Sequence, residues 1–155
     1  MKIRKLSTGE SVPMDLLLLA DPSEEMVQSY LADGDCYLAE DEDRVVGVYV
    51  LAQTKADKVE ILNVAVREEL HGQGMGKMLI LDAIEKARLA GYKTIEIGTG
   101  NSSIGQLALY QKCGFRLSSI DNDFFIRNYK EEIFENGIQC KDMVRLTLEL
   151  NPRNG

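Results

Sequence analysis

The sequence predicts an α/β fold organised around one strand, the glycine-rich turn that follows it, and a long helix. Three observations carry this prediction. Apolar runs predict neighbouring strands at Cys36–Glu40, Val45–Gln53 and Val59–Val66. The glycine-rich turn His71–Lys77 then leads into a helix from about Gly76 to Ala90, whose apolar residues recur at helical spacing. The next strand is Thr94–Gly98, so this helix is a crossover between two strands that we expect to be parallel.

Length and composition describe an ordinary globular chain. Its 155 residues predict a single domain over residues 1–155, large enough for a substantial core. The net charge of −7 argues against nucleic acid or an anionic membrane as the main partner. The apolar run Leu16–Ala20 is far too short to cross a bilayer, and no signal peptide is evident.

The cysteines also narrow the possibilities. There are three, an odd number, and no two of them form a Cys-x-x-Cys pair. We therefore expect no disulfide framework and no metal site, and we expect the chain to lie in the reduced cytoplasm.

The flanking segments complete the element order. Met1–Leu6 is a short strand and Ser11–Leu19 a helix with Pro13 in its first turn. A second helix begins after an Asp21 or Ser23 cap and ends before Gly34. Beyond Gly98 we expect a loop at Thr99–Ser103 and a short helix at Ile104–Cys113. The last two strands are expected at Phe115–Ile120 and Met143–Leu150, and residues 121–142 between them form an irregular excursion with an Asn-Gly turn.

The glycine-rich turn predicts an anion site. Glycine lets the backbone approach a ligand closely, and the first amides of a helix have no partner inside it, so a phosphorylated ligand suits this position. Two familiar motifs fail on spacing. A P-loop needs Ser or Thr where Met78 stands and glycine where His71 stands, and a dinucleotide fingerprint needs glycine where Lys77 stands.

Instead, the turn resembles the signature of the GNAT acetyltransferase superfamily. Val64-Ala65-Val66 is similar to the apolar triplet that ends the family's strand, and Gly74-x-Gly76 matches its glycines, with His71 in place of Gln or Arg. The segment Leu107–Arg116 is similar to the family's Leu-Tyr-x-x-x-Gly-Phe sequence, and the order of elements agrees. The resemblance implies an α/β (α+β) acyl-CoA N-acyltransferase fold, with a mixed sheet of six to seven strands and helices on both faces.

The same resemblance implies where acetyl-CoA binds. The two parallel strands splay apart, and the pantetheine arm enters the gap to pair with backbone groups of Val64, Ala65 and Val66. The pyrophosphate takes amides of the turn, namely Gly72, Gln73, Gly74, Met75, Gly76 and Lys77. Ser103 stands where the family often has an asparagine that contacts CoA, and Asn101 is the alternative.

Two residues are candidates for the chemistry. Acyl transfer to an amine needs the neutral amine, and deprotonating a lysine-like ammonium at neutral pH costs about 4–5 kcal/mol. Glu60 matches the glutamate that some family members use as base, and we expect it on the same strand face as Val64. Tyr110 resembles the family's general acid. The alternatives are a solvated Glu60 and a core Tyr110. His71 lies at the phosphate site and Cys113 has no histidine nearby in sequence, so neither is favoured.

Two functions remain open. The first is an acetyl-CoA-dependent N-acetyltransferase that acts on a primary amine by direct attack in a ternary complex; a homodimer is compatible with it. The second is a catalytically silent GNAT-fold module that senses acyl-CoA. For the enzyme we expect a small cationic amine or lysine-like acceptor, attracted by Asp121 and Asp123 beside an aromatic wall of Phe124, Phe125 and Tyr129. The alternative is that these acids only face water.

Overall fold

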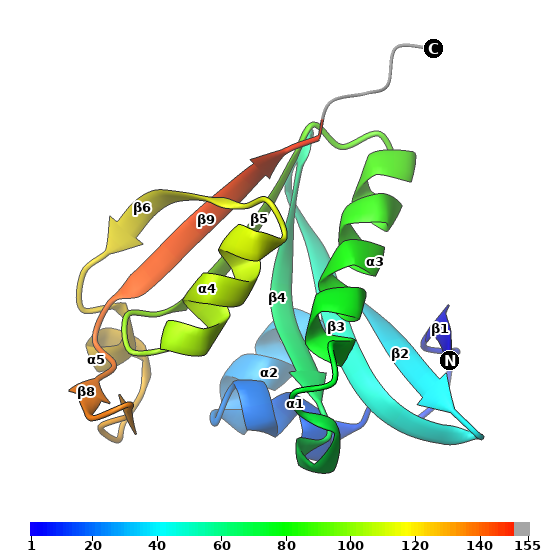
Figure 1. Ribbon diagram of the computed structural model, residues 1–155, viewed down its shortest axis with the longest axis horizontal. Coiled ribbons are helices and arrows are strands. Elements are labelled where there is room, and N and C mark those ends of the chain that lie inside the picture. The colour runs from blue at the N-terminus through cyan, green and yellow to red at the C-terminus, as the bar shows by residue number, and fades with distance from the viewer. Residues whose placement is uncertain (151–155) are drawn as a thin grey trace.

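The computed structural model describes residues 1–150, which form one seven-stranded mixed sheet in the order β1-β2-β3-β4-β5-β9-β6 and a separate two-stranded hairpin, β7-β8 (Figure 1). The strands are β1 Lys2–Lys5, β2 Asp35–Asp41, β3 Arg44–Lys55, β4 Lys58–Val66, β5 Thr94–Gly100, β6 Arg116–Asp121, β7 Phe134–Glu135, β8 Ile138–Gln139 and β9 Met143–Glu149. The helices are α1 Met14–Ala20, α2 Glu24–Leu31, α3 Met75–Leu89, α4 Ile104–Lys112 and α5 Phe124–Asn128, with a 3₁₀ turn at Glu68–Leu70. The predicted α/β fold with a mixed sheet of six to seven strands is confirmed.

Helices cover both faces of the sheet. On one face α3 and α4 pack over the larger core cluster, which includes Leu79 and Ile80 of α3 and Tyr110 of α4. On the other face α1 and α2 pack over a second cluster, with Leu16, Leu17 and Val27 buried. Among residues 1–150 no helix is both long and apolar enough to cross a membrane.

The parallel pair opens partway along its length. β4 and β5 pair from Lys58 with Thr94 to Ile61 with Ile97, and this is the one parallel pairing in the described sheet. Past Ile61 β4 pairs with β3 alone, while past Ile97 β5 pairs with β9 alone. The two strands therefore separate just before the glycine turn, and Figure 1 shows them diverging.

A β-bulge in β4 sets which residues face the gap. Val50 pairs with Asn63 but the next residue, Leu51, pairs with Ile61, so Leu62 is an extra residue in the ladder. The bulge reverses the alternation of side chains: Val64 packs on the α3–α4 side, whereas Asn63 reaches α1 and α2. The prediction that Glu60 shares a face with Val64 is therefore wrong, because it assumed that side chains alternate without interruption along the strand.

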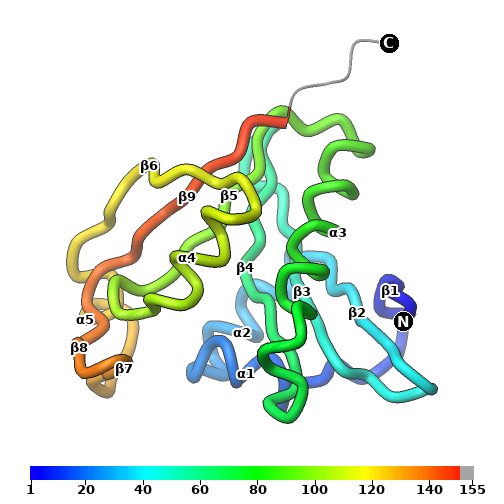
Figure 2. Tube along the Cα trace, in the orientation of Figure 1, coloured from blue at the N-terminus to red at the C-terminus, as the bar shows by residue number. Residues whose placement is uncertain are grey.

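The excursion is more regular than the sequence indicated. It contains α5 and the β7–β8 hairpin, whose turn residues Asn136 and Gly137 both have positive φ, as a tight hairpin turn requires. β5 also continues for two residues into the expected loop, because Thr99 and Gly100 pair with Val144 and Met143 of β9. The trace in Figure 2 places the excursion at the end of the sheet where α4 begins.

Candidate active site

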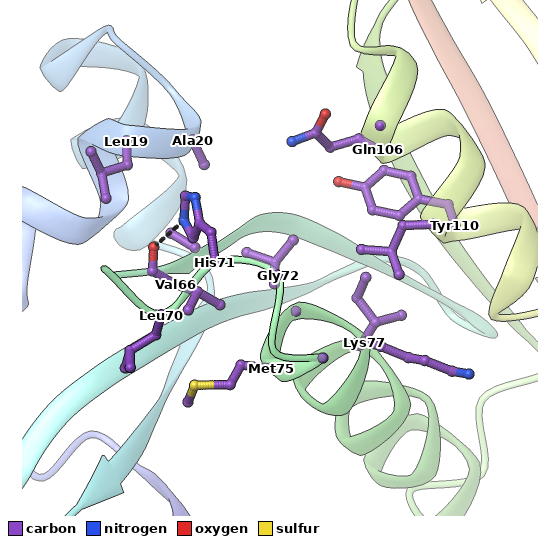
Figure 3. A pocket seen from close by; sticks show the side chains of 17 residues that line it. Leu19, Ala20, Val66, Leu70, His71, Gly72, Met75, Lys77, Gln106 and Tyr110 are labelled. Carbon is purple, nitrogen blue, oxygen red and sulfur yellow. Dashed lines mark hydrogen bonds between the residues drawn. The ribbon is translucent and has the colours of Figure 1, made fainter. Parts of the chain in front are cut away.

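Two cavities meet where β4 and β5 separate. The turn cavity, about 400 Å³, is lined by the end of β4, the glycine turn and the start of α3 (Figure 3). The gap cavity, about 380 Å³, lies between the α1–α2 corner, the opened strands and the excursion. They share five lining residues: Leu19, Ala20, Val64, Gln106 and Tyr110. A ligand filling the turn cavity would thus reach the edge of the gap cavity.

The glycine turn has the geometry of an anion site. Gly72 and Gly74 both have φ of 81°, and the space where a Cβ would stand is open at each. Gly74 is the N-cap of α3, and Met78 N–H closes the first turn on the Gly74 carbonyl, so the preceding amides have no partner inside the helix. No acidic residue lies in this first turn. Nothing there opposes a bound phosphate, which the helix dipole would favour.

His71 fixes the turn to the end of β4. Its Nε2 lies 2.7 Å from the Val66 carbonyl oxygen, and Figure 3 shows the ring between Val66 and Ala20. Of the predicted cofactor residues, Val64, Ala65, Val66, Gly72, Gly74, Met75, Gly76 and Lys77 line the turn cavity. Gln73 lies within the turn but does not line the cavity. In Figure 3 the Lys77 side chain points away from the Tyr110 hydroxyl, so the turn faces the cavity mainly with backbone.

Tyr110 lies at the junction of the two cavities. It is 5% exposed, yet it lines both, and in Figure 3 its hydroxyl points into the turn cavity. The hydroxyl makes no hydrogen bond to residues 1–150. Burial raises the pKa of Tyr110, and nearby Cys113 adds to the effect. The phenol therefore stays protonated and has its hydrogen free to donate.

Glu60 lies elsewhere. It lines neither cavity, and its carboxylate accepts a hydrogen bond of 3.1 Å from Arg145 on β9. Burial raises the pKa of Glu60, and the neighbouring Arg145 opposes that shift. This placement argues against the prediction that Glu60 is the base, since the bulge at Leu62 separates it from the face that Val64 presents.

The structure also separates Asn101 from Ser103, the two residues predicted as alternative contacts to CoA. Asn101 holds the chain before β9: its Nδ2 donates to the Gln139 carbonyl, and its Oδ1 accepts from the amides of Lys141 and Asp142. It lines neither cavity, which argues against its predicted contact with CoA. Ser103 does line the gap cavity, where its hydroxyl donates to Glu135 at 2.7 Å.

The acidic residues of the gap cavity are not the predicted ones. Asp121 pairs with Arg127, and neither Asp121 nor Asp123 lines a cavity. Instead the cavity is lined by Asp21 and Glu135, and none of its lining residues within the described chain is Lys, Arg or His. Sequence reasoning read Asp21 only as a helix cap and gave Glu135 no role, because no local pattern shows that the two meet.

The aromatic wall is present in part. Phe125 lines the gap cavity, and its ring lies 5.2 Å from that of Phe124 and 5.3 Å from that of Tyr129. Phe124 and Tyr129 do not line the cavity, but the Tyr129 hydroxyl donates to Asp21 at 2.9 Å. Within residues 1–150 no three His, Cys, Asp or Glu side chains are grouped to hold a metal ion.

The opened parallel pair, the glycine turn and the crossover helix define the class of protein: an acyltransferase of the GNAT fold. The model of the Acetyltransferase (GNAT) family matches residues 10–115. The chain is 64% identical over 136 residues, 88% of either chain, to the uncharacterized N-acetyltransferase YvbK of Bacillus subtilis. The chain therefore belongs to the GNAT acetyltransferase family and is an N-acetyltransferase.

Three solved acetyltransferase structures are similar to this chain in both sequence and fold. A GNAT acetyltransferase from Elizabethkingia anophelis with acetyl-CoA bound superposes with a TM-score of 0.95 at 50% identity, covering 96% of this chain and 97% of that one. An IAA acetyltransferase from Bacillus cereus gives 0.92 at 51% identity, with 96% and 99% covered. A Bacillus subtilis acetyltransferase in complex with CoA gives 0.89 at 59% identity, with 96% and 98% covered.

Proposed function

We propose that this chain transfers the acetyl group of acetyl-CoA to a primary amine of a positively charged acceptor, by direct attack within a ternary complex. One observation carries the proposal. Two cavities meet at a protonated, buried tyrosine. One has the backbone geometry of a phosphate site, and the other is lined, within residues 1–150, by two carboxylates and no basic side chain. Acetyl-CoA suits the first cavity and a cationic amine the second.

The glycine turn and the end of β4 are proposed to hold the cosubstrate. The amides from Gly72 to Lys77 would bind the pyrophosphate, and the backbone of Val64–Val66 would pair with the pantetheine arm. Relatives half or more identical to this chain bind acetyl-CoA or CoA, which supports the assignment. The three free cysteines fit the reduced cytoplasm predicted from the sequence.

Tyr110 is proposed as the group that assists the leaving sulfur. Acetyl-CoA supplies a thioester: the amine nitrogen forms a bond to its carbonyl carbon, the carbon–sulfur bond breaks, and the electron pair of that bond leaves on sulfur. Tyr110 would donate its hydroxyl hydrogen bond to this developing thiolate. Because burial raises the pKa of Tyr110 and a thiol is already the stronger acid, we expect hydrogen bonding rather than complete proton transfer. The proton lost by the amine passes to water.

Thiol release from acetyl-CoA tests this function. Three acceptors are compared: a cationic amine, a neutral amine of the same size, and IAA, for which the Bacillus cereus relative is named. We expect release with the cationic amine well above release without acceptor. Acetyl-CoA binding by calorimetry without release on any amine would instead support the acyl-CoA sensor.

A further inference from the structure

Asp21 is held in place by residues from three different parts of the chain. Its Oδ1 accepts hydrogen bonds from the Tyr129 hydroxyl, at 2.9 Å, and from the Ser23 amide, at 3.1 Å. Its Oδ2 accepts one of 3.3 Å from the Tyr30 hydroxyl. The carboxylate thus joins the α1–α2 corner, α2 and the end of α5 at the wall of the gap cavity. Such neutral donors orient a carboxylate and leave its charge uncompensated.

Asn63 adds an observation of a different kind. It is 5% exposed, it lines the gap cavity, and its Nδ2 donates to the Leu17 carbonyl and to the Tyr30 hydroxyl, at 3.0 and 2.8 Å. Its Oδ1 is the one buried side-chain polar atom in residues 1–150 without a hydrogen-bond partner. Folding leaves such an atom unpaired only at a cost, which a donor on a ligand would remove.

The Tyr30 hydroxyl links these two side chains. It donates to Asp21 Oδ2 and accepts from Asn63 Nδ2, so the carboxylate and the amide group both contact one oxygen atom. A carboxylate and an amide oxygen, with no Lys, Arg or His among the cavity-lining residues of the described chain, fit an ammonium group, which has N–H donors for both.

The ammonium held there is not the nitrogen that reacts. A neighbouring carboxylate stabilises the charged form of an amine and raises its pKa, whereas attack on a thioester needs the neutral form. If Asp21 held the reacting nitrogen, it would oppose the reaction. Ala20, one residue earlier, lines both cavities together with Tyr110, whereas Asp21 lines only the gap cavity. Asp21 is therefore on the side of the reaction site away from the glycine turn.

We propose that the acceptor is a diamine: Asp21 and the Asn63 Oδ1 hold one of its amino groups as an ammonium ion, and the other amino group attacks the acetyl group beside Tyr110. This inference rests on the proposed function. It makes Asp21 and Asn63 specificity-determining residues, and it makes Tyr30 and Tyr129 residues that position the carboxylate.

Paired acceptors test the inference. We compare kcat/KM for putrescine and for n-butylamine, which is similar in length but has one amino group. The parent enzyme should prefer putrescine by on the order of tenfold or more, and Asp21→Asn should remove most of this preference while hardly affecting n-butylamine. The control, Asp121→Asn, also removes one surface carboxylate but lies outside both cavities, and it should leave both values unchanged.

A second variant covers the case in which Asp21→Asn does not fold. Tyr129→Phe keeps the charge of Asp21 and removes one orienting hydrogen bond, so it should reduce the putrescine preference severalfold in the same direction. Equal preference in the parent, or equal losses for both amines in the variants, would overturn the inference while leaving N-acetylation intact. Failure of the parent to acetylate any amine would count against the proposed function, and the inference would fall with it.

Discussion

Tyr110 is almost completely buried and still lines both cavities. Tyr110→Phe removes only the hydroxyl, which has no partner among the described residues, so we expect folding and acetyl-CoA affinity to change little. Loss of a hydrogen bond made in the transition state should lower kcat by about 100-fold. Single-turnover kinetics and calorimetry measure the two quantities separately. An unchanged rate of the chemical step would remove Tyr110 from the mechanism.

The pH dependence of the parent enzyme tests the same residue. In the proposed mechanism Tyr110 acts in its protonated form, and burial raises its pKa above the ordinary value of about 10. A raised pKa keeps an acid protonated to higher pH, so kcat should show no loss from Tyr110 ionisation between about pH 7 and pH 10. A decline centred below that upper limit, present in the parent and absent in Tyr110→Phe, would contradict this.

Gly74 allows a matched test of the phosphate site. Gly74→Val introduces a β-branched side chain where φ is 81°, and Gly9→Val does the same where φ is 82°; neither Cβ would meet an atom within 4 Å. Both variants should lose about 1–2 kcal/mol of stability from backbone strain. Gly74→Val alone should lose acetyl-CoA binding, because its side chain covers amides of the turn. Equal acetyl-CoA binding by the two variants in calorimetry would show that the pyrophosphate does not bind at this turn.

The sequence predicts Glu60 as the catalytic base, whereas its position in the structure argues against that role. Because it lines neither cavity, Glu60→Gln should leave the shape of the kcat–pH profile unchanged. A base would behave differently, since its loss matters most at mildly acidic pH, where less of the amine is neutral. The ratio of variant to parent kcat, followed from pH 6 to pH 9, decides the matter; a selective deficit at the acidic end would restore Glu60 as the base.

At the scale of elements, the segment between β8 and β9 depends on Asn101. Its side chain makes three hydrogen bonds to the backbone of residues 139–142, so Asn101→Ala should lower stability by about 1–3 kcal/mol. Acetyl-CoA affinity should stay within about twofold of the parent, because Asn101 lines neither cavity. Thermal unfolding and calorimetry give both numbers. Weaker acetyl-CoA binding with parent-like stability would instead support the contact predicted from sequence.

The bulge in β4 explains why the elements were easier to predict than their faces. Apolar residues at Val59, Ile61, Val64 and Val66 are all consistent with one strand, and the structure confirms it as β4. One extra residue at Leu62 nevertheless exchanges the two faces beyond it. Asn63 turns toward α1 and α2 only because of this exchange, and Glu60 is left on the opposite side from Val64.

At the scale of the whole molecule, charge should steer the acceptor. The net charge is −7, and the gap cavity adds two carboxylates without a basic side chain among its described lining residues. For a cationic acceptor, kcat/KM should fall as salt rises from about 0.01 M to 0.5 M, because screening shortens the range of attraction from about 30 Å to a few ångströms. A neutral amine of the same size is the control and should show no such fall. Parallel salt dependence of both would argue against steering.

The sequence alone determined most of the architecture and the position of the glycine turn, which is the proposed phosphate site. Local patterns carry that information: glycine can adopt the positive φ seen at Gly72 and Gly74 without steric cost, and helical spacing with a glycine after the helix marks α3. Two motifs in the right order, the glycine turn and Leu107–Arg116, were sufficient to predict the family fold that the comparisons confirm.

Only the tertiary structure decided which residues line the gap cavity, the proposed acceptor side. The gap cavity brings together Asp21, Asn63, Ser103 and Glu135, which are separated by up to 114 residues, the difference between positions 135 and 21. Local preferences do not encode this arrangement, since it depends on the bulge at Leu62, on the separation of β4 from β5 and on a β7–β8 hairpin that is bonded to Asn101 after β5. The conformation of a backbone turn depends on neighbouring residues in the sequence, whereas a cavity lined by side chains forms only when distant strands pair.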